Sequence, residues 1–432
     1  MTSVNKQLKQ SIIWRGFYFI TLLLINIVLS RFLKADGAGV VFYLSNLFSI
    51  GVLVFSANLD GGVTYFASSK TIENEKLASL AIIWTLIITL VSFFTLPLYF
   101  NTYDFDLKNN SADLTQFGIY YIVGILLTNF FTALFYSVGN FVIPNVILGV
   151  TNLLLIGLIY FGVNTNASAS EIMHDYFQFL VFQGILLLLA FYITYKILPV
   201  INLPNWTDFK QLLKYSSISL IGNFLFFFVY RLDYWFVKAW CIHIGELGNY
   251  IQASKLSQML LIIPQILASS IFPQIASGYN KDEIVNTIAR LCRIFSVVFL
   301  VLFFVILGIG KFLFPLIFGS SFSTMYLPML ILLPGIFCLC CSSLLSAYFS
   351  GRKQNQINLY AASLALLVML VLTFTLKSSY SIIVAASISS IAYFIETLFC
   401  FIHFTKNETI NWRTLFYYSF DDWLWIKRIL IK

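Results

Sequence analysis

The chain has 432 residues, of which 59% are hydrophobic and only 10% are charged, and it carries 45 phenylalanines. A soluble domain of this length has about 25% charged residues, so the composition excludes a soluble protein and predicts a polytopic membrane protein. The apolar runs are unbroken and often reach about twenty residues, the length that spans a bilayer as a helix. Strands of a membrane barrel are shorter and alternate in polarity, so we expect an all-α fold.

Taken in chain order, the apolar runs predict twelve transmembrane helices. They lie near 11–33, 39–67, 78–100, 117–138, 141–163, 173–198, 212–240, 246–278, 288–310, 326–349, 357–376 and 380–405. Only Gly139-Asn140 and Pro144 separate the fourth run from the fifth. Merging these two would invert the orientation of every later span.

Basic residues test this division, because Lys and Arg accumulate in the cytoplasmic loops of membrane proteins. With the N-terminus inside, most of the 26 basic residues are cytoplasmic, and the outer loops and rims carry only Arg31, Lys34, Lys108, Lys238, Lys311 and Lys377. This bias favours twelve spans with both termini in the cytoplasm. The net charge of +8 is therefore mostly a topology signal. The sequence has no basic stripe interleaved with aromatics, so it does not predict a nucleic-acid partner.

Residues that carry chemistry are sparse. The six cysteines have no metal-type spacing and the three histidines are scattered, so we expect neither a metal site nor a cofactor nor a Ser-His-Asp site. The longest outer loop, 101–116, is too short to house a catalytic domain. These features argue against an enzyme and for a transporter.

Two amphipathic tracts suggest the domain organisation. The first, within 201–214, predicts a cytoplasmic interfacial helix that joins an N-terminal six-helix lobe, 1–200, to a C-terminal six-helix lobe, 215–405. The tail, 406–432, mixes tryptophans with basic residues, which is typical of an amphipathic helix at the inner headgroup layer.

The two halves show a weak internal repeat. Gly39 opens the second span and leads to a charged turn at Lys70, and Gly248 opens the eighth and leads to a charged turn at Lys281. Six spans leave both halves in the same orientation. We therefore expect parallel repeats related by a pseudo-twofold axis along the membrane normal.

Three basic residues at membrane depth are candidate substrate ligands, because a charge there costs about 2.5–3.5 kcal/mol on insertion scales. They are Arg231 in the seventh span, Lys255 in the eighth and Arg15 in the first. Arg suits an anionic substrate, since it binds phosphate oxygens with two N–H groups and stays protonated when desolvated. Each has an alternative: Arg15 could reach the inner headgroups, Arg231 could pair with Asp233, and Lys255 could lie at the outer rim.

Three acidic residues, Asp233, Glu396 and Asp60, are candidates for coupling to a proton or sodium gradient. The sequence has no nucleotide-binding motif that would supply energy instead. Asp60 could also cap a helix or face the cytoplasm, and Glu396 could pair with a basic residue. Other polar residues in the spans could line a cavity or bond between helices: Asn26, Asn46, Asn58, Asn129, Asn152, Asn223 and Gln183.

Four short motifs carry a resemblance to a known family. They are S-R-F-L-K-A-D-G-A-G from Ser30, R-L-D from Arg231, G-E-L-G-N-Y from Gly245 and I-F-P from Ile271. Spread over twelve spans, they resemble the Wzx-type polysaccharide flippases of the multidrug/oligosaccharidyl-lipid/polysaccharide exporter superfamily. The first motif departs from the family pattern at Ala35-Asp36, where the family often has Leu-Gly.

The resemblance implies a central cavity lined by the first, second, seventh and eighth helices. It implies transport by alternating access of an oligosaccharide repeat unit of O-antigen or capsule, carried on undecaprenyl diphosphate, from the cytoplasmic to the periplasmic leaflet of a bacterial inner membrane. Membrane lipids and other polysaccharide assembly proteins are the implied partners. A diphosphate lipid with a polar sugar chain cannot cross hydrocarbon unaided, so such cargo needs a cationic, hydrated path.

Three other functions remain open. A multidrug or organic-cation antiporter of the same fold would favour a cavity rich in acids. The lipid II flippases of the superfamily usually carry two extra helices, which this sequence lacks. A membrane enzyme of a polysaccharide pathway would need an outer loop loaded with catalytic residues.

Overall fold

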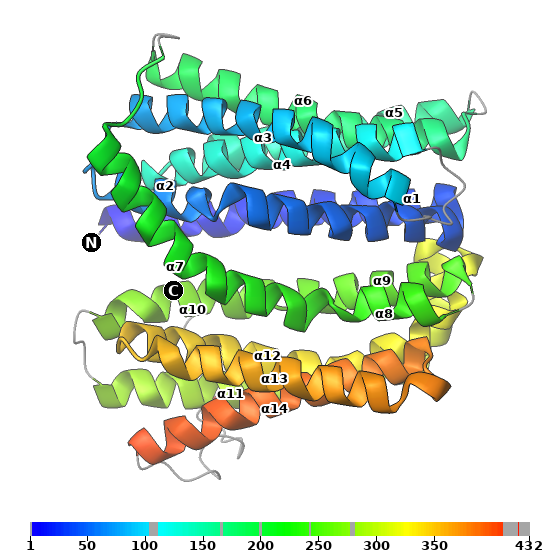
Figure 1. Ribbon diagram of the computed structural model, residues 1–432. Helices are drawn as coiled ribbons and strands as arrows, with labels where there is room; N and C mark the ends of the chain where they lie inside the picture. Colours follow the sequence, from blue (N-terminus) through cyan, green and yellow to red (C-terminus); the bar gives the residue numbers. More distant parts are fainter. Residues whose placement is uncertain are drawn as a thin grey trace. The chain divides into compact units, whose positions relative to one another are not determined.

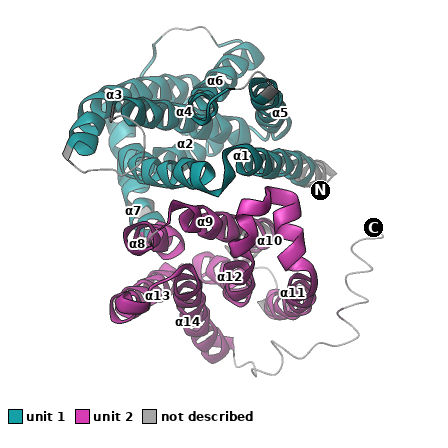
Figure 2. Cartoon of the chain, turned by 90° about the vertical axis from the view of Figure 1, so that its right-hand side faces the viewer, with its two compact units in different colours: residues 1–224 teal, residues 225–432 magenta. Residues whose placement is uncertain are grey.

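The protein is seen in a computed structural model that describes residues 2–102, 111–164, 167–197, 201–241, 243–276, 281–408 and 422. All regular structure in these ranges is helical (Figure 1). The chain forms two compact units, residues 1–224 and 225–432 (Figure 2). The boundary lies inside the helix of the seventh predicted span.

Unit 1 is a helical bundle centred on α4. It comprises α1 (Thr2–Ser56), α2 (Leu59–Ser68), α3 (Asn74–Thr102), α4 (Ser111–Ser137), α5 (Val142–Asn164), α6 (Ala169–Tyr195) and the first part of α7 (Trp206–Arg231). Helix α4 packs against α1, α2, α3 and α6. Its buried face carries Phe131 and Phe135, whose rings contact Phe191 of α6.

Two glycines allow α4 and α6 to approach closely. A Cβ atom on Gly124 of α4 would lie 2.5 Å from the backbone carbon of Leu180, and one on Gly184 of α6 would lie 2.7 Å from the Cβ of Leu127. Small residues at such crossings are typical of membrane helices, where packing drives association. The close contact between α4 and α6 therefore requires glycine at both positions.

A buried polar network also joins α1, α5 and α6. The Asn152 amide donates to Thr21 Oγ1 at 2.9 Å. The Gln183 amide donates to Asn152 Oδ1 at 2.6 Å and to Thr151 Oγ1 at 2.9 Å. For Asn152 and Gln183, the prediction of interhelical hydrogen bonds is thus confirmed.

Unit 2 is centred on α12. It comprises α8 (Asp233–Trp240), α9 (Ile244–Met259), α10 (Ile262–Ala276), α11 (Lys281–Phe318), the 3-10 helix η1 (Ser320–Met325), α12 (Tyr326–Gly351), α13 (Asn355–Thr375), the 3-10 turn η2 (Lys377–Ser379) and α14 (Ile382–Glu408). Helix α12 packs against α9, α10, α11, α13 and α14. A Cβ on Gly335 of α12 would lie 2.7 Å from Ser390 Cα of α14, so this crossing also requires glycine.

The helices account for the predicted spans. In the described residues, ten helical segments are long and apolar enough to cross a membrane. The first, Gln10–Ser56, contains the first predicted span and most of the second, and its helix is interrupted at Lys34 with φ 57° and ψ −177°. The eighth predicted span is carried by the shorter α9 and α10. The chain is an all-α polytopic membrane protein, whereas the predicted lobe limits and pseudo-twofold axis stay predictions.

The division between the fourth and fifth spans is confirmed. Helix α4 ends at Ser137 and α5 begins at Val142. Gly139 adopts a φ of 76°, a left-handed conformation that glycine enters without steric cost. Asn140 Oδ1 then accepts a hydrogen bond from the Ile143 amide at 3.2 Å, which caps the start of α5.

Three predicted spans are not continuous helices, which the apolar runs did not show. The second breaks at Ala57 and Asn58, which have φ values of 48° and 55°. The seventh breaks between α7 and α8, and the eighth between α9 and α10. Pro264 explains the last break, because proline cannot donate to the carbonyl of Leu260 and its ring crowds that group.

The two amphipathic tracts have different outcomes. Residues 206–214, within the predicted linker, form the first turns of α7. The predicted tail helix lies mostly outside the described residues. Asp422, which is described, is buried and accepts hydrogen bonds from Arg290 at 3.2 Å and from Arg293 at 2.8 Å. The tail is thus anchored to α11 at this residue.

Candidate functional site

Asp233 lies in unit 2, directly after the end of α7. Helix α7 ends at Arg231, and Asp233 opens α8 after the single turn residue Leu232. An acidic side chain is favoured in the first turn of a helix, where it complements the positive end of the helix dipole. The Asp233 side chain is 2% exposed, so its carboxylate depends on partners within the protein.

Two hydroxyls bind this carboxylate from two other helices. Tyr250 of α9 donates to Asp233 Oδ2, and Ser389 of α14 donates to the same oxygen at 2.8 Å. The other oxygen, Oδ1, has no hydrogen-bond partner among the described residues. The carboxylate therefore joins α8, α9 and α14 and retains one unused acceptor.

A second layer of hydrogen bonds supports the helix break. The Tyr234 hydroxyl donates to Ser254 Oγ at 2.9 Å, and the Gln258 amide donates to the same oxygen at 3.1 Å. Gln258 also donates to the backbone oxygen of Tyr230 at 3.2 Å. That carbonyl lies at the end of α7, where the last carbonyls lack partners within the helix. Gln258 thus helps to hold the break in place.

Unit 2 holds two of the predicted cations, Arg231 at the end of α7 and Lys255 on α9. Both side chains are half-buried. The Arg231 guanidinium carbon lies 5.8 Å from the centre of the Phe227 ring. Each cation takes part in at least one further interaction. Two like charges in a bundle of apolar helices favour the approach of an anion.

Glu396 of α14 lines a cavity of about 470 Å³ in unit 2. The side chain is 3% exposed. Oε1 accepts a hydrogen bond from Ser342 of α12 at 3.3 Å, and Oε2 has no hydrogen-bond partner among the described residues. The carboxylate therefore has acceptor capacity beside an open space.

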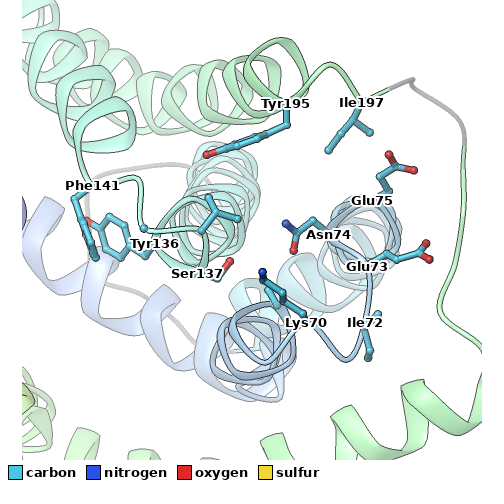
Figure 3. Close-up of a pocket in the computed structure, with 13 residues that line it drawn as sticks. Lys70, Ile72, Glu73, Asn74, Glu75, Tyr136, Ser137, Phe141, Tyr195 and Ile197 are labelled. Atoms are coloured by element: carbon cyan, nitrogen blue, oxygen red, sulfur yellow. The ribbon is translucent and has the colours of Figure 1, made fainter. Parts of the chain in front are cut away.

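Arg15 lies in unit 1 beside the aromatic wall of another cavity. Its guanidinium carbon is 4.4 Å from the centre of the Tyr136 ring and 5.5 Å from that of Phe141. Both rings line a cavity of about 970 Å³, where Lys70 and Tyr195 also lie (Figure 3). A stacked guanidinium of this kind is held by cation–π attraction, worth about 0.5–2 kcal/mol.

Asp60, the remaining candidate, lies half-buried in the first turn of α2. The break before it is formed by Asn58, whose side-chain oxygen accepts a hydrogen bond from the Asn223 amide at 2.7 Å. An acidic side chain in this turn complements the helix dipole, and the role of Asp60 stays a prediction. The candidates thus divide: Arg15 and Asp60 belong to unit 1, and the other four belong to unit 2.

Sequence reasoning did not identify the hydroxyls around the two buried acids. Tyr250 belongs to the G-E-L-G-N-Y motif, yet nothing in the sequence connects it with Asp233 or Ser389. Ser342 begins a set of α12 serines that recur every four residues, Ser342, Ser346 and Ser350. That spacing places them on one helix face, and it was a usable signal for a polar stripe.

Solved structures share this fold. The chain is similar to lipid II flippase MurJ in an inward closed conformation, with a TM-score of 0.70 at 13% identity over 94% of this chain and 88% of that one. It is similar to the Vibrio cholerae MATE transporter VcmN in the bent form, with a TM-score of 0.62 at 14% identity over 94% and 97% of the two chains.

A third similar structure is a MOP superfamily transporter from Pyrococcus furiosus, whose binding pocket is described as having reverse polarity. Its TM-score is 0.59 at 13% identity, over 94% of this chain and 97% of that one. No family model and no curated protein matches the sequence. The chain therefore has the fold of these transporters, and its cargo has to be argued from its own residues.

Proposed function

We propose that this protein is a flippase for lipid-linked oligosaccharides, moving undecaprenyl-diphosphate-linked repeat units from the cytoplasmic to the periplasmic leaflet of a bacterial inner membrane. The observation that carries the proposal is the presence in unit 2 of two half-buried cations among apolar helices, Arg231 at the end of α7 and Lys255 on α9. A diphosphate carries the negative charge that two such cations attract. Arginine adds a geometry that matches phosphate oxygens.

The hydrogen bonds of Asp233 support this assignment. Oδ2 is occupied by two hydroxyl donors, Tyr250 and Ser389, and Oδ1 has no hydrogen-bond partner among the described residues. Hydroxyl groups thus bind the acid that the sequence places nearest to Arg231. The hydroxyls of Tyr250 and Ser389 share the negative charge of Asp233, which reduces its competition with a bound anion for Arg231.

Coupling to an ion gradient is a further part of the proposal. Asp233 offers one unpartnered oxygen within a set of hydroxyls, which suits a proton or a sodium ion. Glu396 is a second buried acid with an oxygen that has no hydrogen-bond partner among the described residues. If lipid flipping in sealed vesicles continues unchanged after proton and sodium gradients are both collapsed, neither acid couples transport.

A second candidate function, antiport of organic cations, is favoured by one observation. Glu396 lines a cavity in which none of the described lining residues is basic. Cations would bind such a surface. The two functions make opposite predictions for Arg231, because an anionic lipid needs this cation and a cationic drug is repelled by it.

Reconstituted vesicles test the proposal. Purified protein is incorporated with a fluorescent undecaprenyl-diphosphate oligosaccharide, and a membrane-impermeant quencher reports the fraction that reaches the opposite leaflet. We expect flipping by the native protein and loss of flipping in Arg231→Ala. Efflux of a cationic dye without any flipping of the lipid would instead establish the antiporter.

A further inference from the structure

The cavity beside Glu396 has a chemical character that recognition of an anion does not explain. It has a volume of about 470 Å³, within the range of roughly 300–1,000 Å³ that small-molecule sites occupy. Helices α7, α10, α12 and α14 of unit 2 supply its walls. The lining residues that matter here are Glu396, Ser342, Ser346, Ser350, Phe226 and Tyr230.

Glu396 gives the cavity an acidic group without a basic residue beside it in the described lining. None of the described lining residues is Lys, Arg or His. One oxygen accepts a single hydrogen bond, from Ser342 at 3.3 Å, and the other accepts none from the described residues. A buried carboxylate is costly unless a cation or several donors satisfy it. A ligand with an ammonium group would supply both the charge and the donors.

The serines of α12 extend the polar surface away from Glu396. Ser342, Ser346 and Ser350 are four residues apart and lie on one face of the helix. Eight residues of helix rise about 12 Å, so these hydroxyls form a line longer than a simple amine can occupy. Hydroxyls both donate and accept, which suits a partner that also carries many hydroxyls.

Aromatic rings complete the lining. Phe226 and Tyr230 lie one helical turn apart with ring centres 6.3 Å apart and planes inclined by 21°. Ring faces attract cations and also pack against the apolar face of a sugar ring. A carboxylate, a line of hydroxyls and two rings together describe a site for a sugar that carries a positive charge.

We propose that this cavity binds an amino sugar with a free ammonium group, the ammonium at Glu396 and the sugar hydroxyls along the serines of α12. The inference rests on the proposed function, since the sugar would belong to the oligosaccharide of the flipped lipid. It makes Glu396 a specificity residue that selects repeat units with an unacetylated amine. The same chemistry could come from a free organic cation, which the experiment distinguishes.

Binding to the purified full chain tests the proposal without requiring transport. The probes are the β-1,4-linked disaccharide of glucosamine, the same disaccharide with both amines acetylated, and tetraphenylphosphonium. Titration calorimetry is carried out on the native protein and on Glu396→Gln, Ser346→Val and the control Glu283→Gln. Glu283 is an exposed carboxylate at the start of α11, outside the cavity.

We expect the native protein to bind the free-amine disaccharide at least about tenfold more tightly than the acetylated one, because a hydrogen bond to a charged group is worth more than a neutral one. Glu396→Gln should abolish this preference, and Glu283→Gln should retain it. Ser346→Val should weaken binding of both disaccharides by roughly two- to tenfold, since one neutral hydrogen bond is lost. This variant keeps the test decisive if Glu396→Gln does not fold.

Two results would overturn the inference. One is equal affinity of the native protein for the two disaccharides, or a preference that survives Glu396→Gln. The other is Glu396-dependent binding of tetraphenylphosphonium without binding of either disaccharide, which would assign the cavity to organic cations. Flipping of the lipid-linked cargo is measured separately. Its absence, with amino-sugar binding intact, would refute the proposed function and leave the binding site standing.

Discussion

Replacement of Arg231 by alanine should abolish most transport while leaving the protein folded. Arg231 lies half-buried at the end of α7, beside Phe227. A hydrogen bond to a charged group contributes about 1.5–3 kcal/mol. At about 1.4 kcal/mol per tenfold change, flipping at low cargo concentration should slow by roughly ten- to a hundredfold. Arg231→Lys should retain part of the activity, since it keeps the charge and loses the planar fork.

The two cations should not act independently. If Arg231 and Lys255 bind the same anion, the effects of Arg231→Ala and Lys255→Ala should fail to add, with a coupling of about 0.5–3 kcal/mol. Initial flipping rates in vesicles, divided by the amount of monodisperse protein, provide the measurement. Lys238→Ala is the matched control, because Lys238 is a half-buried cation on the adjacent α8.

A structural role for Arg231 makes a different prediction. If Arg231→Ala reduces the amount of folded protein while the surviving molecules transport at the native rate, Arg231 does not bind cargo. Restored abundance in the double variant with Asp233→Ala would identify the two residues as an ion pair. The structure gives Asp233 the hydroxyls of Tyr250 and Ser389 as partners, so we expect no such restoration.

The remaining predictions concern coupling, stability and topology. Asp233→Asn should remove the dependence of flipping on an ion gradient, and an unaltered gradient dependence would exclude Asp233 as the carrier. Asp422→Ala should destabilise unit 2 by about 3–5 kcal/mol, since it leaves Arg290 and Arg293 without their buried acid, and an unchanged melting temperature would contradict this. Gly124→Leu should prevent the close packing of α4 on α6, seen as loss of monodisperse protein, whereas Leu at Gly157, which has open space around it, should be tolerated. Reporter fusions should read outside at Asn109 and Thr165 and inside at Asn74, Asn140, Gln354 and Asn407, and the opposite reading at Asn140 and Thr165 would refute the topology.

Hydrophobic run length was sufficient to predict the helical class and the positions of most spans. The division at Gly139-Asn140 was also accessible, because Gly and Asn favour left-handed backbone and Pro144 fits the first turn of α5. The interruptions at Asn58 and Leu232 could not be predicted from the sequence, because the apolar composition continues through both. In each case the stabilising contact comes from distant residues, Asn223 for Asn58 and Gln258 for the end of α7.

Charged residues at membrane depth were easy to identify in the sequence, but their interaction partners were hard to predict from it. An ion pair with Asp233 was one alternative for Arg231 in the sequence, and the observed hydroxyl donors to Asp233 Oδ2 are 17 and 156 residues away. Pairing depends on which helices become neighbours, and that is decided by packing. The partners of Glu396 were hidden for the same reason, because Ser342 is 54 residues away on α12.

The hydroxyl partners of the two buried acids in unit 2 have a consequence for what the protein can carry. A buried ion pair between Arg231 and Asp233 would satisfy both charges internally and leave little attraction for a ligand. Hydroxyls at Asp233 and Glu396 instead satisfy the acids only in part, since each keeps one oxygen without a hydrogen-bond partner among the described residues. Unit 2 can therefore attract an anion at Arg231 and Lys255 and a cation at each acid. A lipid with a diphosphate at one end and an amino sugar further along its head carries both kinds of charge, whereas a simple organic cation would use the acids alone.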